Sequence, residues 1–492
     1  MMGLRHVGSR FVQVSSRAHF SKVATGSGCE DLAKVDPEMH RILLEEKQRQ
    51  IRSLNLIASE NYASKAVLQA LGACVHNKTS EGMVGNRYYG SCVNIDKVEQ
   101  LCKDRALAAY RLDPSIWGVN VQTLSGSMAN LSVYKGLLKP GGRIMGLYLS
   151  DGGHLTHGYS SGKRRLTASS EFYESMSYRT DPNTGLIDYD KLHEWASGFE
   201  PRLIIAGISC YPRHLDYKRF RDIADDVGAY LLGDIAHISG LVAAGIGPDP
   251  FKYCDVVTTT TYKSLRGPRT AMVLYRKALA TEQTSGEVKI FNLEKRINEA
   301  VFPGTHGAPH NHAIASLAVA LKEVVSDDYR AYQRQAVANC KILATCLQTL
   351  GYHIVTGGIT DMNMLLANLK NKGITGKMAQ TILEHVGIDV NMNTCPGDIS
   401  PLRPSGVRLG TSAITSRGLK EKDIENCVIL LNRGIGIAQK AKKIGQERSI
   451  PFITVLRNVS EIAAEISNLK SEVEDFAEGY PMPGIDGCSI KI

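Results

Sequence analysis

Short apolar segments alternate with helical segments between residues 96 and 261, and this alternation constrains the fold more than any other feature. Segments of strand length lie at 118–123, 143–149, 203–209, 229–233 and 255–261. Helical segments begin at Ser125-Gly126-Ser127 and again near residue 217. Strands that alternate with helices favour a mostly parallel sheet that carries helices on both faces. The sequence therefore predicts an α/β fold.

The pattern changes after about residue 312. A helical stretch at 313–350 contains no strand, and short strands at 352–355, 364–369 and 405–409 follow it, with a helix near 377–385 and two terminal helices. This predicts a smaller C-terminal α+β domain at 313–492, which begins with a long connecting helix. The large domain then spans 96–312. An N-terminal arm, which begins with a helix at 36–53, occupies 30–95.

Residues 1–29 differ in composition from the rest of the chain. They contain Arg5, Arg10, Arg17 and Lys22, five serines, and neither Asp nor Glu. Their apolar residues at 4, 7, 11 and 14 share one helical face. This pattern is typical of an organellar transit peptide and predicts the mitochondrial matrix, with a plastid-type organelle as the alternative. A disordered tail with incidental arginines is the other interpretation.

Bulk composition excludes several classes of function. The net charge of +9 is partly concentrated in the first 29 residues, and the remainder is too diffuse to predict nucleic-acid binding. No apolar run of about 18 residues exists, so we expect no membrane span. The eleven cysteines are scattered without zinc-ligand spacing, which predicts free thiols and no metal site.

Three polar features follow predicted strands or precede a helix. Lys263 follows four threonines whose β-branched side chains favour a strand, and Gly267-Pro268 must end that strand. Asp234 ends the strand at 229–233. Ser125-Gly126-Ser127 precedes a helix, where amides and hydroxyls can hold a phosphate. Taken singly, these features indicate a solvated charge, a structural ion pair and an ordinary helix cap.

Taken together, the three features suit pyridoxal phosphate. A lysine forms a Schiff base with the aldehyde of this cofactor, an aspartate keeps the pyridine nitrogen protonated, and a helix N-terminus fixes the phosphate. Ligands of open α/β sheets bind beyond the carboxyl ends of the strands, which is where these residues are expected. A histidine could stack on the ring, and His154 follows a strand in the right part of the chain.

Residues 30–485 resemble the serine hydroxymethyltransferases. The resemblance implies the pyridoxal-phosphate-dependent transferase fold of type I, which is aspartate aminotransferase-like. Its matching segments are LIASEN (56–61), NRYYGS (86–91), DGGHLTHGYSSGK (151–163), YKRFRDIADDVGAYLLGDIAHISGLVAAG (217–245), TTTTYKSLRGPR (258–269), FPGTHGAPHNH (302–312), NTCPGD (393–398) and VRLGTSAITSRG (407–418).

The resemblance implies specific roles around the cofactor. Lys263 matches the Schiff-base lysine, Asp234 the partner of the pyridine nitrogen, and His154 the ring-stacking histidine. His237 matches a histidine near the cofactor hydroxyl. The matching phosphate cradle and further cofactor contacts are Ser125, Gly126, Ser127, Ser209 and Gly307.

The resemblance also implies roles on the substrate side. Arg408 matches the arginine that pairs with the amino-acid carboxylate, and Glu81 the acid/base that handles the serine hydroxyl proton. Ser59 and Tyr89 match substrate contacts, with Tyr89 reaching in from a neighbouring subunit. Residues that match the folate side are Tyr88, Leu149, Leu155 and Asn393. A homodimer is implied, because the family builds each site from two chains; pairing of dimers into a tetramer is left open.

The implied reaction interconverts serine plus tetrahydrofolate with glycine plus 5,10-methylenetetrahydrofolate through a pyridoxal phosphate aldimine. Five departures from the family pattern affect the parts of the site that this reaction needs. Thr79 replaces a tyrosine and Tyr262 a histidine. Ala308, Met392 and Asn363 replace a glycine, a lysine and a histidine, respectively. They cluster at phosphate anchoring, the subunit interface and the folate entrance.

Three functions therefore stay open. The first is a hydroxymethyltransferase with weakened cofactor or folate binding. The second is a catalytically weak or inactive homologue that acts as a binding or assembly partner. The third is folate-independent aldol cleavage of β-hydroxy amino acids.

Overall fold

The computed structural model describes residues 30–162, 164–282, 288–398, 400 and 403–485. The described residues divide into two compact units, one that includes 30–49 and one that includes 50–485. In the first unit, α1 (Leu32–Val35) precedes most of α2 (Pro37–Ile51). The predicted transit peptide lies outside the described residues. The division of the body at 96 and 313 stays a prediction.

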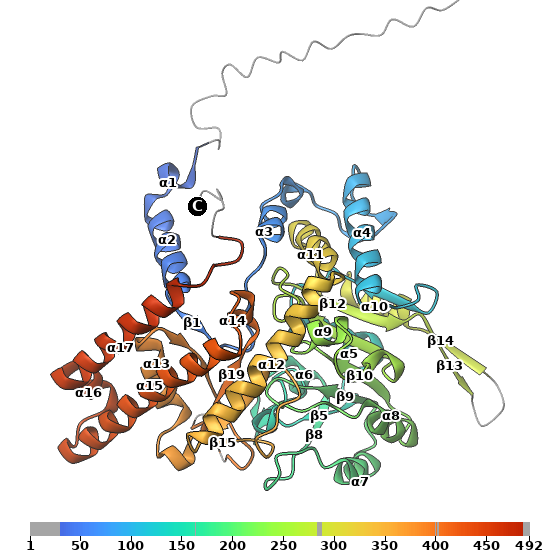
Figure 1. Cartoon of the computed structure of the whole chain (residues 1–492). Helices are drawn as coiled ribbons and strands as arrows, with labels where there is room; N and C mark the ends of the chain where they lie inside the picture. The colour runs from blue at the N-terminus through green and yellow to red at the C-terminus, as the bar shows by residue number, and fades with distance from the viewer. Residues whose placement is uncertain (1–29, 163, 283–287, 399, 401–402, 486–492) are drawn as a thin grey trace, which may run out of the picture. The chain divides into compact units, whose positions relative to one another are not determined.

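A seven-stranded sheet forms the centre of the second unit (Figure 1). Its strand order is β4 (Trp117–Asn120), β12 (Ala271–Arg276), β11 (Val256–Thr260), β10 (Tyr230–Asp234), β9 (Leu203–Gly207), β5 (Arg143–Leu147) and β8 (Glu174–Tyr178). The pairs from β11 to β8 are parallel, whereas β12 runs antiparallel to both of its neighbours. The prediction of a mostly parallel sheet is confirmed.

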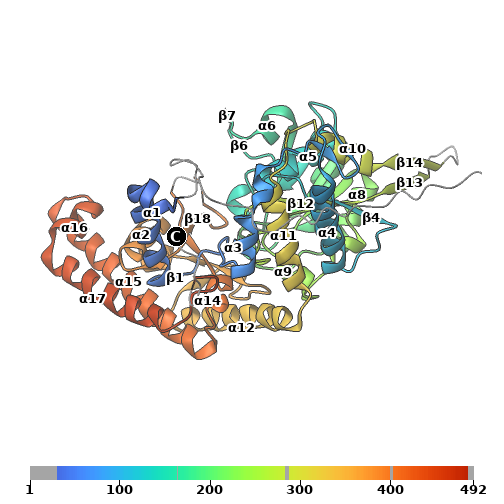
Figure 2. The ribbon, with the colours of Figure 1, turned by 90° about the horizontal axis from the view of Figure 1, so that it is seen from above.

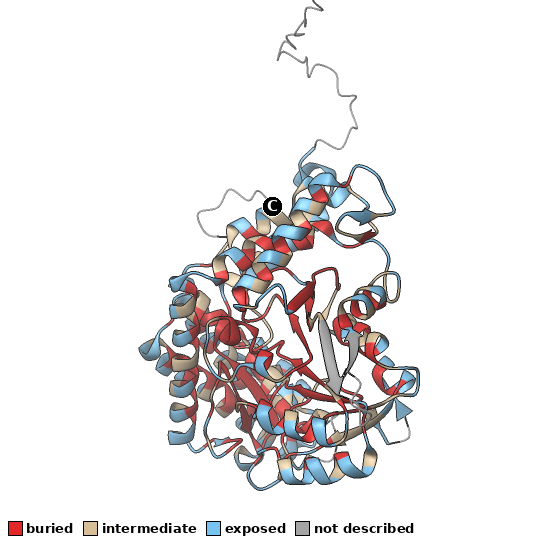
Figure 3. Cartoon of the chain, turned by 90° about the vertical axis from the view of Figure 1, so that its right-hand side faces the viewer, coloured by how far each residue is buried: buried red, intermediate tan, exposed pale blue. Residues whose placement is uncertain are grey.

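Both faces of this sheet are covered, because alternate strand residues enter different cores. Leu203 and Ile205 pack on one side with α5 (Gly126–Leu137) and α10 (Leu293–Val301). Ile204 and Ala206 belong to the opposite core, with α4 (Val93–Ala109), α7 (Tyr189–Phe199), α8 (Tyr217–Asp226) and α11 (Asn311–Val324). Figure 3 shows the strands of this sheet as buried. Strands buried on both faces read as continuous apolar runs, which explains the sequence pattern.

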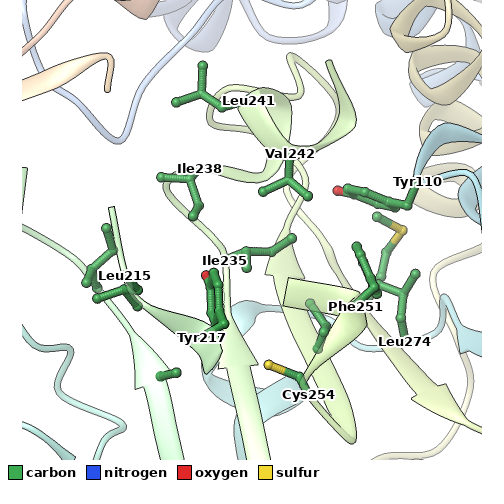
Figure 4. Close-up of a cluster of buried hydrophobic side chains, with 14 of the residues drawn as sticks. Tyr110, Leu215, Tyr217, Ile235, Ile238, Leu241, Val242, Phe251, Cys254 and Leu274 are labelled. Atoms are coloured by element: carbon green, nitrogen blue, oxygen red, sulfur yellow. The ribbon is translucent and has the colours of Figure 1, made fainter. Parts of the chain in front are cut away.

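The larger core also fixes the segment that follows β10. Ile235, Ile238 and Leu241 pack with Tyr110 and Phe251 in the buried cluster of Figure 4. This apolar packing anchors the residues that come directly after the carboxyl end of β10.

A second sheet in the same unit is antiparallel, in the order β15 (His353–Ile354), β16 (Met364–Asn368), β19 (Gly406–Gly410) and β18 (Asn391–Asn393). Its apolar core includes α12 (Asp327–Thr349), α13 (Gly376–His385), α15 (Glu421–Arg448), α16 (Phe452–Asn458) and α17 (Ser460–Glu478). Figure 2 shows α4 and α11 side by side, and likewise α15 and α17.

Two helix predictions need correction. The stretch at 313–350 is two helices, because Ser326 caps a new helix by accepting a hydrogen bond from the Tyr329 amide at 3.2 Å. Within the described residues after 420, three helices of seven or more residues are present instead of the two predicted, because α16 begins directly after Pro451. No helix in the described part of the chain combines the length and apolar composition needed to cross a membrane.

Candidate active site

Three neighbouring strands end at the same edge of the large sheet. The register pairs Asp234 with Gly207 of β9 on one side and with Thr258 of β11 on the other. The loops after these strands therefore carry Ser209, His237 and Lys263 to one place. This is the edge at which open α/β sheets bind ligands.

Lys263 is buried, and among the described residues its side chain makes one hydrogen bond. Its Nζ donates to Thr260 Oγ1 at 2.9 Å. Burial lowers its pKa to about 8, with Asp234 opposing the shift and Arg408 adding to it. A lysine with a lowered pKa is neutral in a useful fraction of molecules near neutral pH, and only the neutral amine is a nucleophile.

Asp234 is a buried carboxylate that three donors hold in its ionised form. Its Oδ2 accepts from Asn130 Nδ2 at 2.9 Å and lies 3.0 Å from His157 Nε2, and its Oδ1 accepts from the Ala236 amide at 3.1 Å. Burial opposes ionisation, but the hydrogen bonds from His157 and Asn130 prevail and lower the pKa of Asp234. The group is therefore suited to hold a proton on a neighbouring nitrogen.

The sequence patterns did not predict the residues that orient Asp234. His157, the second histidine of DGGHLTH, is buried against it, and Asn130 comes from α5. Thr156 Oγ1 joins this network, accepting from Asn130 Nδ2 at 2.8 Å and lying 2.8 Å from His154 Nδ1. Burial and the neighbouring His157 lower the pKa of His154 to about 4, so its ring is neutral. The available signal was the pair of histidines three residues apart.

His237 has an unused polar atom. Its Nε2 lies 3.5 Å from Arg408 Nη1, while its Nδ1 is buried and has no hydrogen-bond partner among the described residues. Burial and the charges of Lys263 and Arg408 hold the pKa of His237 well below its usual range. With Nε2 accepting from the arginine, the neutral ring presents an N–H at Nδ1. Such a buried donor indicates a ligand acceptor.

Arg408 extends from β19 of the second sheet. It donates from Nη1 to Ser209 O at 2.7 Å and from Nε to Asn391 Oδ1 at 3.1 Å, and its Nη2 lies 3.5 Å from Ser59 Oγ. Within the described residues, no carboxylate forms an ion pair with it. A buried guanidinium without a counter-ion is costly. The site is therefore ready for a carboxylate ligand, which an arginine edge binds in a bidentate manner.

The N-terminus of α5 lies beside Thr260. Ser125 caps this helix by accepting from the Met128 amide at 3.3 Å. A Cβ on Gly126 would lie 2.7 Å from Thr260 Cγ2, so only glycine allows this approach of helix to strand. Ser127 follows as an exposed residue of the first turn. The free amides and the helix dipole at such an end attract a phosphate.

Tyr262, at the position where the resemblance predicts a histidine, contacts two cations. The guanidinium carbon of Arg269 lies 4.5 Å from the centre of its ring, and Lys263 Nζ lies 5.1 Å from it. Both distances lie within the range of cation–π attraction. The tyrosine thus connects the lysine to the arginine that ends the TTTTYKSLRGPR segment.

The remaining predicted residues form separate groups. Glu81 lies beside Gly307, where an added Cβ would be 3.0 Å from Glu81 Oε1. Tyr88 is 79% exposed and Tyr89 47% exposed, and the Tyr88 ring lies 5.7 Å from that of Phe302. Across the ranges that the structure describes, no hydrogen bond or ion pair joins Glu81, Tyr88 or Tyr89 to Lys263.

The other three folate-side predictions lie in separate parts of the chain. Leu149 begins the short helix η2 (Leu149–Asp151), Leu155 is 47% exposed, and Asn393 ends β18. Of the departures, Thr79, Ala308 and Met392 are exposed. Asn363 is buried, and its Oδ1 has no partner in the described part of the chain.

Comparison with known proteins gives a consistent result. The family described as serine hydroxymethyltransferase matches residues 32–431. A serine hydroxymethyltransferase of Bombyx mori is 50% identical over 456 residues, 93% of this chain and 98% of its own. The cytosolic serine hydroxymethyltransferase of Oryctolagus cuniculus is 52% identical, with coverage of 92% and 94%. The chloroplastic serine hydroxymethyltransferase 3 of Arabidopsis thaliana is 48% identical, with coverage of 92% and 84%.

Proposed function

The chain belongs to the serine hydroxymethyltransferase family, and from this premise we propose which of its residues carry the reaction. The activity is that of a pyridoxal-phosphate-dependent enzyme that interconverts serine and glycine with tetrahydrofolate as co-substrate. The assignment of individual residues to steps is our proposal, as are the subunit arrangement and the compartment.

The groups at the sheet edge fit pyridoxal phosphate. Lys263 would take the aldehyde, Asp234 the pyridine nitrogen, and the N-terminus of α5 the phosphate. The unpartnered Nδ1 of His237 supports a contact with an oxygen of the cofactor. When bound, the cofactor supplies a conjugated ring that accepts the electrons of the broken Cα–Cβ bond.

The observation that carries the proposal is the buried Arg408 without a carboxylate partner among the described side chains. Arg408 binds the carboxylate of serine and orients its Cα–Cβ bond, and Ser59 lies beside the same guanidinium edge. Lys263 accepts or returns a proton at Nζ, which its pKa of about 8 permits near neutral pH. Asp234 stays ionised and keeps the ring nitrogen charged. His154 and Ser209 line the rest of the proposed cofactor site.

Glu81 and Gly307 act in the same site, because they are neighbours in the fold. By resemblance, the 304–308 loop and Tyr89 serve the site of a second chain. We therefore place Glu81 in that site too, as the group that moves the serine hydroxyl proton, and we propose a homodimer. The exposed rings of Tyr88 and Tyr89 support this arrangement, since contact with a second chain would cover them.

The exposed departures are proposed to weaken binding and to leave the chemical step intact. Thr79 and Ala308 replace residues on the phosphate side, and Met392 removes a positive charge on the folate side. Residues 1–29 are proposed to direct the chain to the mitochondrial matrix, with a plastid-type organelle as the alternative. Import of a reporter fused to these residues tests the compartment.

Absorbance spectroscopy tests the function directly. Pyridoxal phosphate is added to the purified protein, and glycine and tetrahydrofolate follow. A visible cofactor band that shifts only when both ligands are present supports the proposal, and serine turnover then measures the activity. No cofactor band at high concentration would favour the assembly-partner function. Cleavage of allo-threonine without serine turnover would favour folate-independent aldol cleavage.

A further inference from the structure

The backbone on both sides of Glu81 is held by side chains outside the proposed reaction. Ser80 O and Gly82 O, the carbonyls that flank Glu81, both accept from Arg87 Nη1, at 3.0 and 2.6 Å. Gly82 O also accepts from Gln122 Nε2 at 3.0 Å. Gly82 itself has φ +105° and no room for a Cβ, which would lie 2.3 Å from Asn86 O. These contacts restrain the backbone on both sides of Glu81.

A buried carboxylate joins the two donors. Glu99 Oε2 accepts from Arg87 Nη2 at 2.7 Å, and Glu99 Oε1 accepts from Gln122 Nε2 at 2.9 Å. The side chains of Arg87 and Glu99 are 3% and 4% exposed, and Gln122 is 1% exposed. Asp96 accepts from Arg87 Nε at 2.8 Å. Glu99 and Asp96 both lie on α4, a helix of 17 residues, so the donors are fixed to a long element.

The Glu81 side chain is less restrained by hydrogen bonds than its backbone. Asn311 donates to Lys78 O at 2.6 Å and accepts from Ser80 Oγ at 3.0 Å, which fixes the segment from the other side as well. The Glu81 carboxylate, however, has no hydrogen-bond or ion-pair partner among the described residues. A rigid backbone under a free carboxylate is the arrangement that proton transfer at a set distance requires.

A gain in folding stability does not by itself explain a buried cluster of charged residues. A buried ion pair contributes little net stability, because desolvation offsets the attraction between its charges. We propose that Arg87, Glu99 and Gln122, which we call the Glu81 clamp, are positioning residues that hold Glu81 for its proton transfer. This proposal rests on the role of Glu81 in the proposed function. The clamp acts through the carbonyls of Ser80 and Gly82 and touches neither substrate nor cofactor.

The test compares Glu99→Gln with Asp255→Asn in the full-length protein loaded with pyridoxal phosphate. Glu99→Gln keeps the shape but leaves Arg87 with fewer counter-charges. We expect kcat for serine to fall about 10- to 100-fold, because a displacement of a catalytic group by about 1 Å has an effect of that size. KM should change little. The value of kcat is calculated per active site, and the sites are counted by cofactor absorbance. Asp255 is the matched control, since it binds Arg221 at 3.0 Å at the opposite ends of the strands. Its variant should keep kcat.

Two further measurements distinguish positioning from folding. In the cofactor-free protein, amide hydrogen exchange at 79–83 should accelerate in Glu99→Gln and stay unchanged in Asp255→Asn. Glu81→Gln and the double variant Glu81→Gln/Glu99→Gln should have equal kcat, because the clamp acts only through Glu81. Gln122→Leu, which retains the Arg87–Glu99 pair, replaces Glu99→Gln if the latter fails to fold, and a smaller fall in kcat is expected.

The outcomes separate the two claims. If Glu81→Gln lowers kcat and Glu99→Gln does not, or if their effects multiply independently, the clamp proposal is overturned and the proposed function stands. If Glu81→Gln leaves kcat unchanged, the assigned role of Glu81 fails, and the clamp proposal fails with it.

Discussion

Replacement of Arg408 by lysine tests the substrate side of the site most sharply. The guanidinium is buried, and Nη1 and Nε already donate to Ser209 O and Asn391 Oδ1. The Nη1–Nη2 edge can still bind a carboxylate, because its other contacts, of Nη1 with His237 Nε2 and of Nη2 with Ser59 Oγ, are both long, at 3.5 Å. Lysine keeps the charge but cannot form two parallel hydrogen bonds.

The magnitude follows from one lost hydrogen bond to a charged group. Such a bond contributes about 1.5–3 kcal/mol, so serine binding should weaken about 10- to 150-fold. The measurement is a serine titration followed by the absorbance of the bound cofactor. Cofactor affinity should change less than serine affinity, because Arg408 is not itself a proposed cofactor contact and is only a neighbour of Ser209 and His237.

Arg417→Lys provides the matched control. Arg417 is also a buried arginine, but it donates to the carbonyls of Ser53, Ala477 and Tyr480 and thus supports the fold. Its variant should lower the free energy of unfolding and leave serine affinity unchanged. If Arg408→Lys binds serine within about threefold of the native chain, a change worth under about 1 kcal/mol, Arg408 does not pair with the substrate carboxylate.

Three further predictions follow from the same geometry. Burial lowers the pKa of Lys263 to about 8, and only the neutral amine attacks, so the rate of cofactor attachment to the apoprotein should rise with pH and level off above about pH 9. A rate that does not change with pH in stopped-flow absorbance measurements would contradict this. Gly126→Ala, whose Cβ would contact Thr260, should weaken cofactor binding about tenfold or more, whereas the control Gly198→Ala, which has open space around it, should not. Equal cofactor affinities of the two variants in a titration would refute the close approach of α5 to Thr260. Tyr262→Leu should lower stability toward urea by about 1–2 kcal/mol through its two cation contacts, and Tyr262→Phe should not; equal losses would assign the effect to the hydroxyl.

The sequence was sufficient to predict five of the seven strands of the large sheet and the positions of their ends, whereas β8 and β12 were not predicted. Runs such as LIIAG at Leu203–Gly207 are apolar throughout because both faces are covered, and the observed strands end within three residues of their predicted positions. Lys263 and Asp234 were found because a charged residue directly after a buried strand stands out in the sequence. Parallel neighbours then bring such residues together without further information.

The remaining site residues depend on contacts that no local pattern records. Asn130 and His157 reach Asp234 from a helix and a loop, and an asparagine inside a helix has no distinctive signal. Arg408 comes from a different sheet, so only resemblance pointed to it. The break at Ser326 was missed because the residues on both sides are helical, although Ser326-Asp327-Asp328 is a typical N-terminal capping sequence.

The predicted departures from the family pattern fall mainly where the fold does not restrain them. Thr79, Ala308 and Met392 are exposed, so their replacement costs little packing free energy. Lys263, Asp234 and Arg408 are buried and bonded, and each loss there would leave a polar group without its partner. Exposed positions near a ligand are restrained only by binding that ligand or a second chain. It follows that these departures should alter affinity for cofactor, folate or partner, and that unfolding measurements alone would not detect them.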